Sequence, residues 1–152
     1  MTDPALINFL RYDSQLTTSG QPSGAQLRAL KALGVDHVIN LALHTHEQAL
    51  PDEAASLAAL GITYTHIPVA FDNPTEADFD AFCGAMAAAG NKALHVHCIM
   101  NWRVTAFLYR YQRDVLGVED AQARAQMERV WNPVASDDPR ARVWAEFIAR
   151  KV

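Results

Sequence analysis

Cys98 and Arg103 stand five positions apart in the sequence, directly after a short apolar run. The run ALHVH at residues 93–97 is typical of a buried strand, and a helical pattern begins at Arg103 and continues to residue 117. In a strand–loop–helix arrangement the loop can bind an anion, because free N–H groups at the helix start point into it and the helix dipole favours negative charge. A cysteine there is expected to be a nucleophilic thiolate. Arg103 can hold a tetrahedral oxyanion with two parallel hydrogen bonds.

The residues between the cysteine and the arginine would surround the bound anion. They are Ile99, Met100, Asn101 and Trp102. Asn101 stands where the loop must turn sharply, and asparagine is one of the few residues besides glycine that tolerates a left-handed backbone. The ring of Trp102 would either form a pocket wall for an aromatic substrate or pack outward, and the sequence leaves both open. The hydroxyl of Thr105 completes this expected substrate-binding set.

The competing interpretation is a buried, inert cysteine beside a helix cap. A lone cysteine after a strand would favour that interpretation. Here a histidine precedes the cysteine, an arginine follows it and a helix begins inside the motif. This combination favours a reactive thiol.

The elements that must position this loop alternate along the chain. Strands are expected at residues 14–20, 35–43, 62–69 and 93–97, and helices at 23–34, 51–61, 74–90, 103–117, 119–130 and 138–150. Ser23 is the expected N-cap of the first helix, and Thr75 with Asp78 forms a capping box on the third. The alternation predicts an α/β fold in a single domain, residues 1–152: a mostly parallel sheet of about four to five strands, helices on both faces, and extra C-terminal helices.

In such a sheet the site lies beyond the carboxyl ends of the strands. Three polar loops are expected at that edge: the segment of His44 and His46, the AFDNPT loop at residues 70–75, and the loop of Cys98. We expect His44 and His46 to line the entrance of the substrate pocket. The C-terminal aromatic residues are expected to form core or the surface of a homodimer. They are Trp131, Trp144 and Phe147.

Length and composition exclude several classes of protein. The chain has 152 residues, 50% of them hydrophobic, which is enough for one buried core. A formal charge of −4 without a Lys/Arg stripe argues against a nucleic-acid partner. No apolar run approaches the roughly 18 residues of a membrane span, and no signal peptide is visible. Cys83 and Cys98 make no disulfide framework, so we expect a cytoplasmic protein.

Several motifs resemble a known family. The pattern of residues 96–105, VHC followed by R-x-T, resembles the His-Cys-x5-Arg-Ser/Thr signature of cysteine-based protein phosphatases. TSGQP at 18–22, VINL at 38–41, IPV at 67–69 with PTEADF at 74–79, and HCIMNWRVTAF at 97–107 resemble its bacterial dual-specificity-phosphatase-like branch, which is linked to β-lactamase-hydrolase-like proteins. This resemblance covers residues 9–115. It implies hydrolysis of a phosphoprotein or small phosphate ester through a phosphocysteine, with no cofactor.

The resemblance also implies roles for three further residues. Attack by the cysteine leaves an alkoxide or phenoxide that needs a proton. Asp72, on the loop that corresponds to the acid loop of the family, would supply it. His97 would orient the loop by hydrogen bonds, and Thr105 would help the thiolate leave the phosphocysteine. The alternatives are a merely solvated Asp72 and a core histidine at His97.

One spacing departs from the family, because four residues rather than five separate Cys98 from Arg103. A loop of this length is also found in rhodanese sulfurtransferases, which bind a smaller anion and carry a persulfide. Three functions therefore stay open: a phosphatase, a sulfurtransferase, and a non-catalytic module that binds phosphate or sulfate. Asp72 and the lack of a second rhodanese-like unit favour the phosphatase.

Two H-x-H pairs, His44/His46 and His95/His97, raise the question of a metal site. Residues i and i+2 share a strand face, so each pair could chelate a metal ion. No acidic residue has a convincing ligand spacing beside them, and we therefore expect no metal.

Overall fold

A five-stranded sheet in the order β1-β2-β5-β3-β4 forms the centre of the computed structural model, which describes residues 5–151. The strands are β1 (Leu10–Arg11), β2 (Leu16–Ser19), β3 (His37–Asn40), β4 (Thr63–His66) and β5 (Leu94–His97). β1 runs antiparallel to β2, and the other neighbouring pairs are parallel. The predicted mostly parallel sheet is confirmed, whereas the edge strand β1 is not among the predicted strands.

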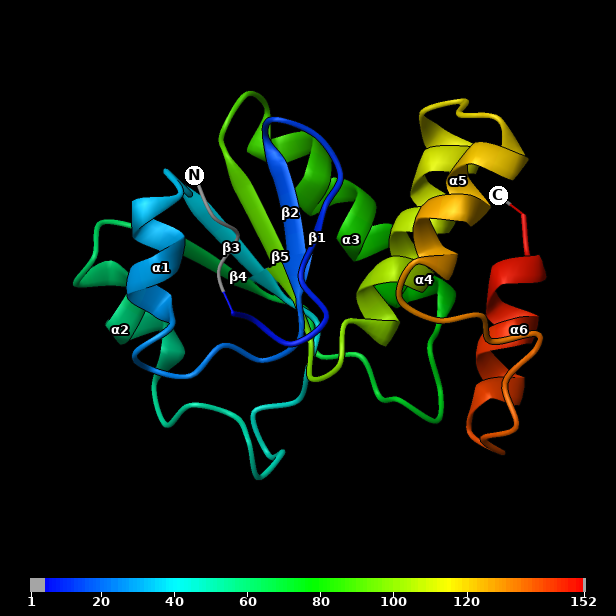
Figure 1. Ribbon diagram of the computed structural model, residues 1–152, viewed down its shortest axis with the longest axis horizontal. Helices are drawn as coiled ribbons and strands as arrows, with labels where there is room; N and C mark the ends of the chain where they lie inside the picture. The colour runs from blue at the N-terminus through cyan, green and yellow to red at the C-terminus, as the bar shows by residue number, and fades with distance from the viewer. Residues whose placement is uncertain (1–4, 152) are drawn as a thin grey trace.

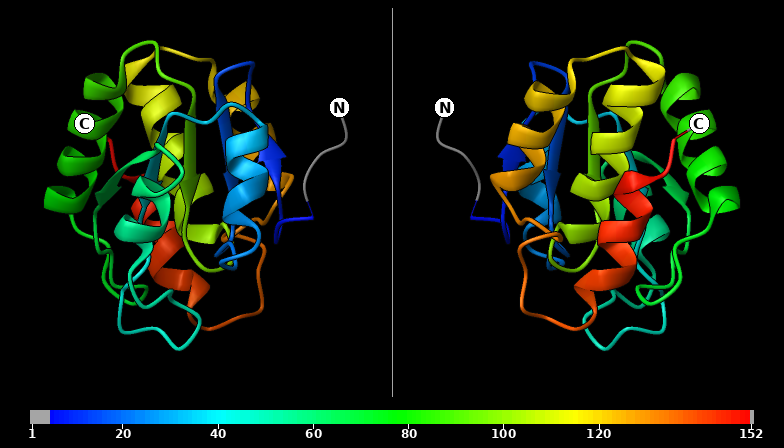
Figure 2. Two further views of the ribbon diagram at one scale, coloured as in Figure 1. Left: turned by 90° about the vertical axis from the view of Figure 1, so that its left-hand side faces the viewer. Right: turned by 90° about the vertical axis from the view of Figure 1, so that its right-hand side faces the viewer.

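Helices cover both faces of this sheet (Figure 1; Figure 2). They are α1 (Leu27–Ala32), α2 (Glu53–Ala58), α3 (Glu76–Ala89), α4 (Trp102–Arg110), α5 (Asp120–Glu128) and α6 (Ala141–Ala149), and a π-helical turn, Tyr111–Val115, extends α4. α1 and α2 pack on one face, and α3 to α6 form the larger core on the other. The predicted fold class, with its extra C-terminal helices, is confirmed. Within residues 5–151, no helix has the length and apolarity needed to cross a membrane.

β5 is the central strand, and each of its residues is buried. Val96 packs into the apolar layer, while His95 joins β5 to β2. Nδ1 of His95 lies 2.8 Å from the hydroxyl of Thr17, and its Nε2 lies 2.8 Å from that of Ser19. Burial, together with the neighbouring His97, holds the pKa of His95 well below its usual range. His95 is therefore a hydrogen-bonded core histidine.

Helix caps follow the sequence closely at α3 and less closely at α1. Thr75 and Asp78 form the predicted capping box, each side chain accepting a hydrogen bond from the backbone of the other. The same reciprocal bonds join Ser23 and Gln26. The residues between them form a turn, however, and α1 begins only at Leu27. The predicted cap at Ser23 is therefore displaced from the helix that it precedes.

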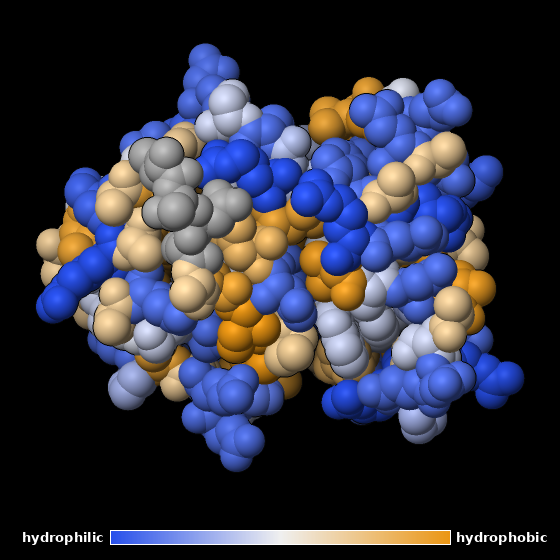
Figure 3. Space-filling view, viewed as in Figure 1, coloured by the Kyte–Doolittle hydropathy of each residue, from blue (hydrophilic) through white to orange (hydrophobic). Residues whose placement is uncertain are grey.

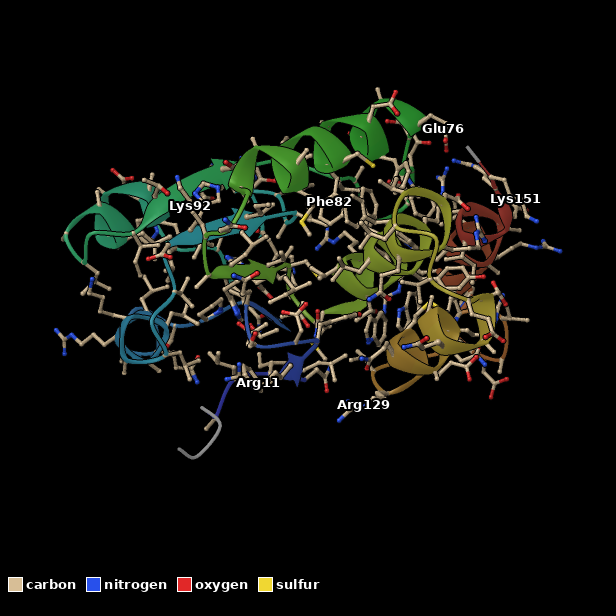
Figure 4. The ribbon with its side chains drawn as sticks, turned by 90° about the horizontal axis from the view of Figure 1, so that it is seen from above. Arg11, Glu76, Phe82, Lys92, Arg129 and Lys151 are labelled. Carbon is tan, nitrogen blue, oxygen red and sulfur yellow. The ribbon has the colours of Figure 1, made fainter. Side chains whose placement is uncertain are left out.

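The C-terminal helices contribute core rather than a free aromatic surface. Trp144 and Phe147 of α6 are fully buried, and Trp131 is 8% exposed. Their rings pack against Phe107 of α4 and Phe71. Figure 4 shows Phe82 among the side chains that fill this layer, and Arg129 at the outer edge of the molecule. Of the two predicted roles for these aromatic residues, core is the one that the structure supports.

The turn after β2 is in direct backbone contact with the loop that follows β5. The amide of Gly20 donates to the carbonyl of Ile7, and the amide of Gln21 donates to the carbonyl of Ile99. A Cβ at Gly20 would lie 2.2 Å from the Ile99 oxygen and 2.9 Å from the Ile7 Cβ. Only glycine allows this backbone approach, and this explains the glycine of the TSGQP segment.

We expect Gly20→Ala to lower the free energy of unfolding by about 1–3 kcal/mol, because the backbone at Ile99 must move to admit the methyl group. Gly24→Ala is the matched control, since an added Cβ there meets no atom within 4 Å. Urea unfolding of both variants checks this. Equal stability of Gly20→Ala and the wild type would contradict the close approach.

Candidate active site

The loop after β5 turns at Asn101, which has a left-handed backbone with φ of 68° and caps α4. Cys98 is 1% exposed, and its amide donates to the carbonyl of Ser19 at 3.3 Å. The loop therefore lies at the carboxyl ends of the parallel strands, at the lower edge of Figure 1, where the connections after β3 and β4 also run. Strand ends, loop and helix start form the geometry of an anion site.

Two polar side chains of the motif shape this loop from behind. Nδ2 of Asn101 donates to the Asn8 carbonyl and the Thr18 hydroxyl, and the hydroxyl of Thr105 donates to the Asn101 carbonyl at 3.0 Å. Both side chains are fully buried, and neither lines the pocket. The side chains of Asn101 and Thr105 were expected to bind substrate, and in the structure they form hydrogen bonds within the fold instead. At Asn101 only the backbone remains for contact with an anion.

Arg103 is fixed by a neighbouring loop. Its Nη1 donates to the carbonyl of Val69 at 2.8 Å, and its guanidinium carbon lies 5.5 Å from the ring centroid of Phe71. The side chain is almost fully buried, and its Nε has no hydrogen-bond partner among residues 5–151. A buried donor without a partner costs about 1–3 kcal/mol, and an oxyanion beside Cys98 would satisfy it.

His97 and Glu53 form a buried ion pair beneath the loop. Nε2 of His97 lies 2.6 Å from a carboxylate oxygen of Glu53, and Nδ1 lies 3.1 Å from the carbonyl of Cys98. The pKa of Glu53 is lowered, so its carboxylate is ionised and can only accept, and Nε2 of His97 donates to it.

Glu53 is the site residue that the sequence analysis missed. Acidic residues are common in the first turn of a helix, because they interact favourably with the helix dipole. Glu53 lies in the first turn of α2, so its position along the chain gave no sign of a second role. It is 3% exposed, and its second oxygen accepts a hydrogen bond from Gln21 at 3.0 Å. Burial alone would raise the pKa of Glu53, but the hydrogen bond and charge interaction with His97 and the hydrogen bond from Gln21 hold it below the usual range.

A cavity of about 510 Å³ opens above the loop. Its lining is mostly apolar and consists of Leu43, Thr45, His46, Phe71, Cys98, Ile99, Met100, Trp102, Arg103 and Arg140. Figure 3 shows apolar side chains gathered toward the middle of one face, between two more hydrophilic flanks. The cavity brings Cys98 and Arg103 together with three of the four predicted loop residues.

Trp102 forms a wall of this cavity, which was one of its two predicted roles. Its ring stacks on Trp131 with centroids 4.7 Å apart and planes 6° apart, and it lies 6.0 Å from Phe71. Phe71 in turn is held by Trp144, whose Nε1 donates to its carbonyl at 2.7 Å. The C-terminal helices therefore support both aromatic walls.

His44 does not line the cavity, in contrast to the prediction. Its ring stacks on His66 with centroids 3.7 Å apart, and its Nε2 lies 2.9 Å from the Tyr64 hydroxyl. These contacts turn the side chain toward β4. His46, two residues later, does line the cavity, and its Nδ1 accepts a hydrogen bond from the amide of Gln48.

Asp72 is exposed and lies outside the cavity lining. The preceding residue, Phe71, lines the cavity instead, and its carbonyl accepts a hydrogen bond from Nε1 of Trp144. No carboxyl group is among the lining residues of this cavity. Asp72 would therefore reach a bound ester only after a movement of its loop.

Metal-ligating side chains do not gather anywhere in residues 5–151: no three His, Cys, Asp or Glu side chains are close enough to hold a metal ion. The H-x-H pairs have other partners. His95 and His97 are engaged by β2 and Glu53, and His44 is engaged by the residues of β4.

Solved structures that resemble this one include proteins described as phosphatases. A DUF442 protein from Shewanella putrefaciens CN-32, described as a candidate phosphatase, is 34% identical with a TM-score of 0.80, and the match covers 95% of this chain and 88% of that one. TpbA of P. aeruginosa, solved in complex with phosphotyrosine, is 20% identical with a TM-score of 0.74, over 99% of this chain and 88% of that one. The second likeness concerns the fold alone.

Curated relatives point to the same group. A β-lactamase-hydrolase-like protein of Xylella fastidiosa is 30% identical over 143 residues, which is 92% of this chain and 32% of that protein. A protein of the same name from Agrobacterium fabrum is 35% identical over 92 residues, 59% of this chain and 21% of its own length. The chain thus spans a third or less of the length of these relatives. No protein-family model matches the sequence.

We expect Glu53→Gln to lower the free energy of unfolding near neutral pH by about 1–3 kcal/mol, because the variant leaves the buried His97 without a charged partner. The folded pKa of Glu53 is lowered, so its contribution is present above the usual pKa of a glutamate and is lost as pH falls through the folded value. The gap between wild type and variant should therefore shrink on acidification.

Urea unfolding at about pH 7, 5 and 3.5 measures this gap. Glu47→Gln, at an exposed position, is the matched control and should stay within about 0.5 kcal/mol of the wild type. A gap of constant size at every pH would refute the ionised pair.

Proposed function

The chain belongs to the bacterial dual-specificity-phosphatase-like branch of the cysteine-based protein tyrosine phosphatase superfamily, and from this premise we propose that it hydrolyses phosphate monoesters through a phosphocysteine without a metal ion. One observation carries the proposal. Cys98 and Arg103 line the same cavity, and the buried Nε of Arg103 has no partner within residues 5–151. An anion at the loop would satisfy that donor.

The first step is attack of the Cys98 thiolate on phosphorus. A sulfur–phosphorus bond forms, the ester phosphorus–oxygen bond breaks, and the leaving oxygen takes the electron pair and a proton. Arg103 and the loop amides hold the equatorial oxygens. The N-terminus of α4 stabilises negative charge at the sulfur and at the phosphate.

In the second step water attacks the phosphocysteine, the sulfur–phosphorus bond breaks, and inorganic phosphate is released with the thiolate restored. Thr105 was expected to assist this departure. Its hydroxyl donates to the Asn101 carbonyl, so its support of the thiolate would be indirect, through the shape of the loop.

Asp72 remains the proposed donor of the proton to the leaving group. It follows Phe71, which lines the cavity, and it would act after a movement of its loop.

The cavity volume favours an ester with a bulky organic group. About 510 Å³ is in the range of sites for small organic molecules, and it exceeds the space needed by an inorganic anion. Apolar walls of Phe71 and Trp102 would suit an aromatic group. A phosphoprotein or a small aryl phosphate is therefore the proposed substrate, and phosphate or sulfate the simplest occupant of the loop.

A second candidate function is sulfur transfer. It is favoured by the four-residue spacing between Cys98 and Arg103 and by the absence of a carboxyl group from the cavity lining. Transfer of the outer sulfur of thiosulfate to Cys98 releases sulfite, which needs no general acid, and cyanide then removes the persulfide sulfur as thiocyanate.

We expect wild-type protein to hydrolyse p-nitrophenyl phosphate with EDTA present, and Cys98→Ser to lose about a thousandfold or more of this activity, because the nucleophile is removed. Cys83→Ser, which changes the other cysteine on α3, is the matched control and should keep the activity. Cys98→Ser should still bind inorganic phosphate, as measured by calorimetry.

Turnover that survives in Cys98→Ser or disappears with EDTA would overturn the phosphocysteine mechanism. If the wild type hydrolyses no ester, the formation of thiocyanate from thiosulfate and cyanide decides for sulfur transfer. Anion binding without either reaction would indicate a binding module.

We expect Asp72→Asn to reduce kcat for phenyl phosphate by about a hundredfold and to change kcat for p-nitrophenyl phosphate little, because only the poorer leaving group depends on a proton donor. Asp80→Asn, at an exposed position of α3, should affect neither ester. The same kcat for phenyl phosphate in Asp72→Asn and the wild type would remove Asp72 from the mechanism.

A further inference from the structure

A second arginine lines the cavity and has no part in the mechanism above. Arg140 lies on the segment between α5 and α6, directly before Ala141, the first residue of α6. Its side chain is exposed, whereas that of Arg103 is buried. The cavity therefore has one cation at its floor, beside Cys98, and another at its mouth.

Both guanidinium groups lie near one ring. The guanidinium carbon of Arg103 is 5.5 Å from the centroid of Phe71, and that of Arg140 is 5.3 Å from the same centroid. The two cations are therefore within about 11 Å of each other. Arg140 also lies 5.9 Å from the ring centroid of Trp102. Contact with two aromatic rings limits the positions that this long side chain can adopt.

Asp138 orients Arg140 without using all of its donors. Nε and Nη2 of Arg140 donate to the carboxylate of Asp138, with the shortest distance 2.7 Å from Nη2. Nη1 of Arg140 donates to no atom in the part of the chain that the structure describes. Arg140 is exposed and Asp138 is half-buried, and ion pairs at the surface are weak. An anion that enters the cavity can therefore compete for Arg140.

The surface between the two cations is apolar. Phe71, Trp102, Leu43 and Met100 contribute to it, and no carboxyl group is among the residues that line the cavity. A ligand that contacts both cations would need an apolar body between two acidic groups. A benzene ring that carries a phosphate and a second acid at opposite positions has this form.

We infer that Arg140 is a specificity-determining residue, and that the preferred substrate is a phosphate monoester whose apolar body carries a second anionic group bound by Arg140. This inference rests on the proposed function of Cys98 and Arg103. It deepens that function, because it adds a second anion to the substrate and assigns it to a residue outside the anion loop.

A pair of esters tests the inference. Phenyl phosphate and 4-carboxyphenyl phosphate differ only in the second anionic group. We expect wild-type KM to be about fivefold lower for the carboxylated ester. A difference of this size is what an exposed or partly exposed ion pair contributes to binding. In Arg140→Gln the ratio of the two KM values should fall to about one. Because the ratio is compared, a general effect of the substitution on activity cancels.

Two further variants sharpen the comparison. Arg142→Gln removes the same charge two residues later, at an exposed position outside the cavity lining, and should keep the wild-type ratio. Asp138→Asn removes the competing carboxylate but keeps the oxygen that accepts from the Arg140 amide. It should increase the preference for the carboxylated ester beyond that of the wild type.

Equal KM values for the two esters in the wild type, or the same loss of preference in Arg142→Gln as in Arg140→Gln, would overturn the inference while the phosphatase activity stands. If neither ester is hydrolysed, the proposed function fails. Calorimetry with Cys98→Ser then tests the inference alone. We expect this variant to bind the carboxylated ester more tightly than phenyl phosphate, and the double variant Cys98→Ser with Arg140→Gln to lose this difference. Equal affinities of Cys98→Ser for the two esters would refute the inference.

Discussion

The buried pair of His97 and Glu53 is the constraint on which the site depends. A carboxylate and an imidazole ring taken out of water are stable only if each keeps its hydrogen bonds. Glu53 satisfies its second oxygen with Gln21, and His97 satisfies Nδ1 with the carbonyl of Cys98. These two bonds connect the turn after β2, the start of α2 and the end of β5. The anion loop is therefore anchored at its first residue by a network that also orders two other elements.

The far wall of the cavity depends on a different kind of interaction. Trp131 stacks on Trp102, and Trp144 donates a hydrogen bond to the carbonyl of Phe71. Both tryptophans come from the C-terminal third of the chain, and both are buried. Large aromatic side chains are efficient supports because they bury much surface and lose little conformational freedom. The helices that follow the α/β sheet thus shape the cavity, while Cys98 and Arg103 come from the loop after β5 and from α4.

Local signals in the sequence predicted the sheet, the helices, the capping box of Thr75 and the turn at Asn101, because each depends on residues a few positions apart. The resemblance to a known family, carried by the motifs around Cys98, predicted the superfamily. Glu53, Arg140 and the orientation of His44 were beyond such signals. Each is decided by partners distant in sequence: His97 for Glu53, Phe71 for Arg140, and the side chains of β4 for His44. The same holds for Asp72. Its position on the loop after β4 was predictable from the sequence, but the direction in which its side chain points was not.

The segment before β1 has a consequence for the order of folding. Nδ2 of Asn8 donates to the carbonyl of Met100, and the carbonyl of Asn8 accepts from Asn101, across 92 and 93 positions of sequence. The entropic cost of closing a chain segment grows with its length, so these bonds form at a higher cost than those within a helix. During synthesis, residues near position 8 leave the ribosome long before the loop does, and the two bonds of Asn8 to Met100 and Asn101 cannot form until it arrives. The anion loop should therefore be completed late, after the strands and helices between its two halves are already in place.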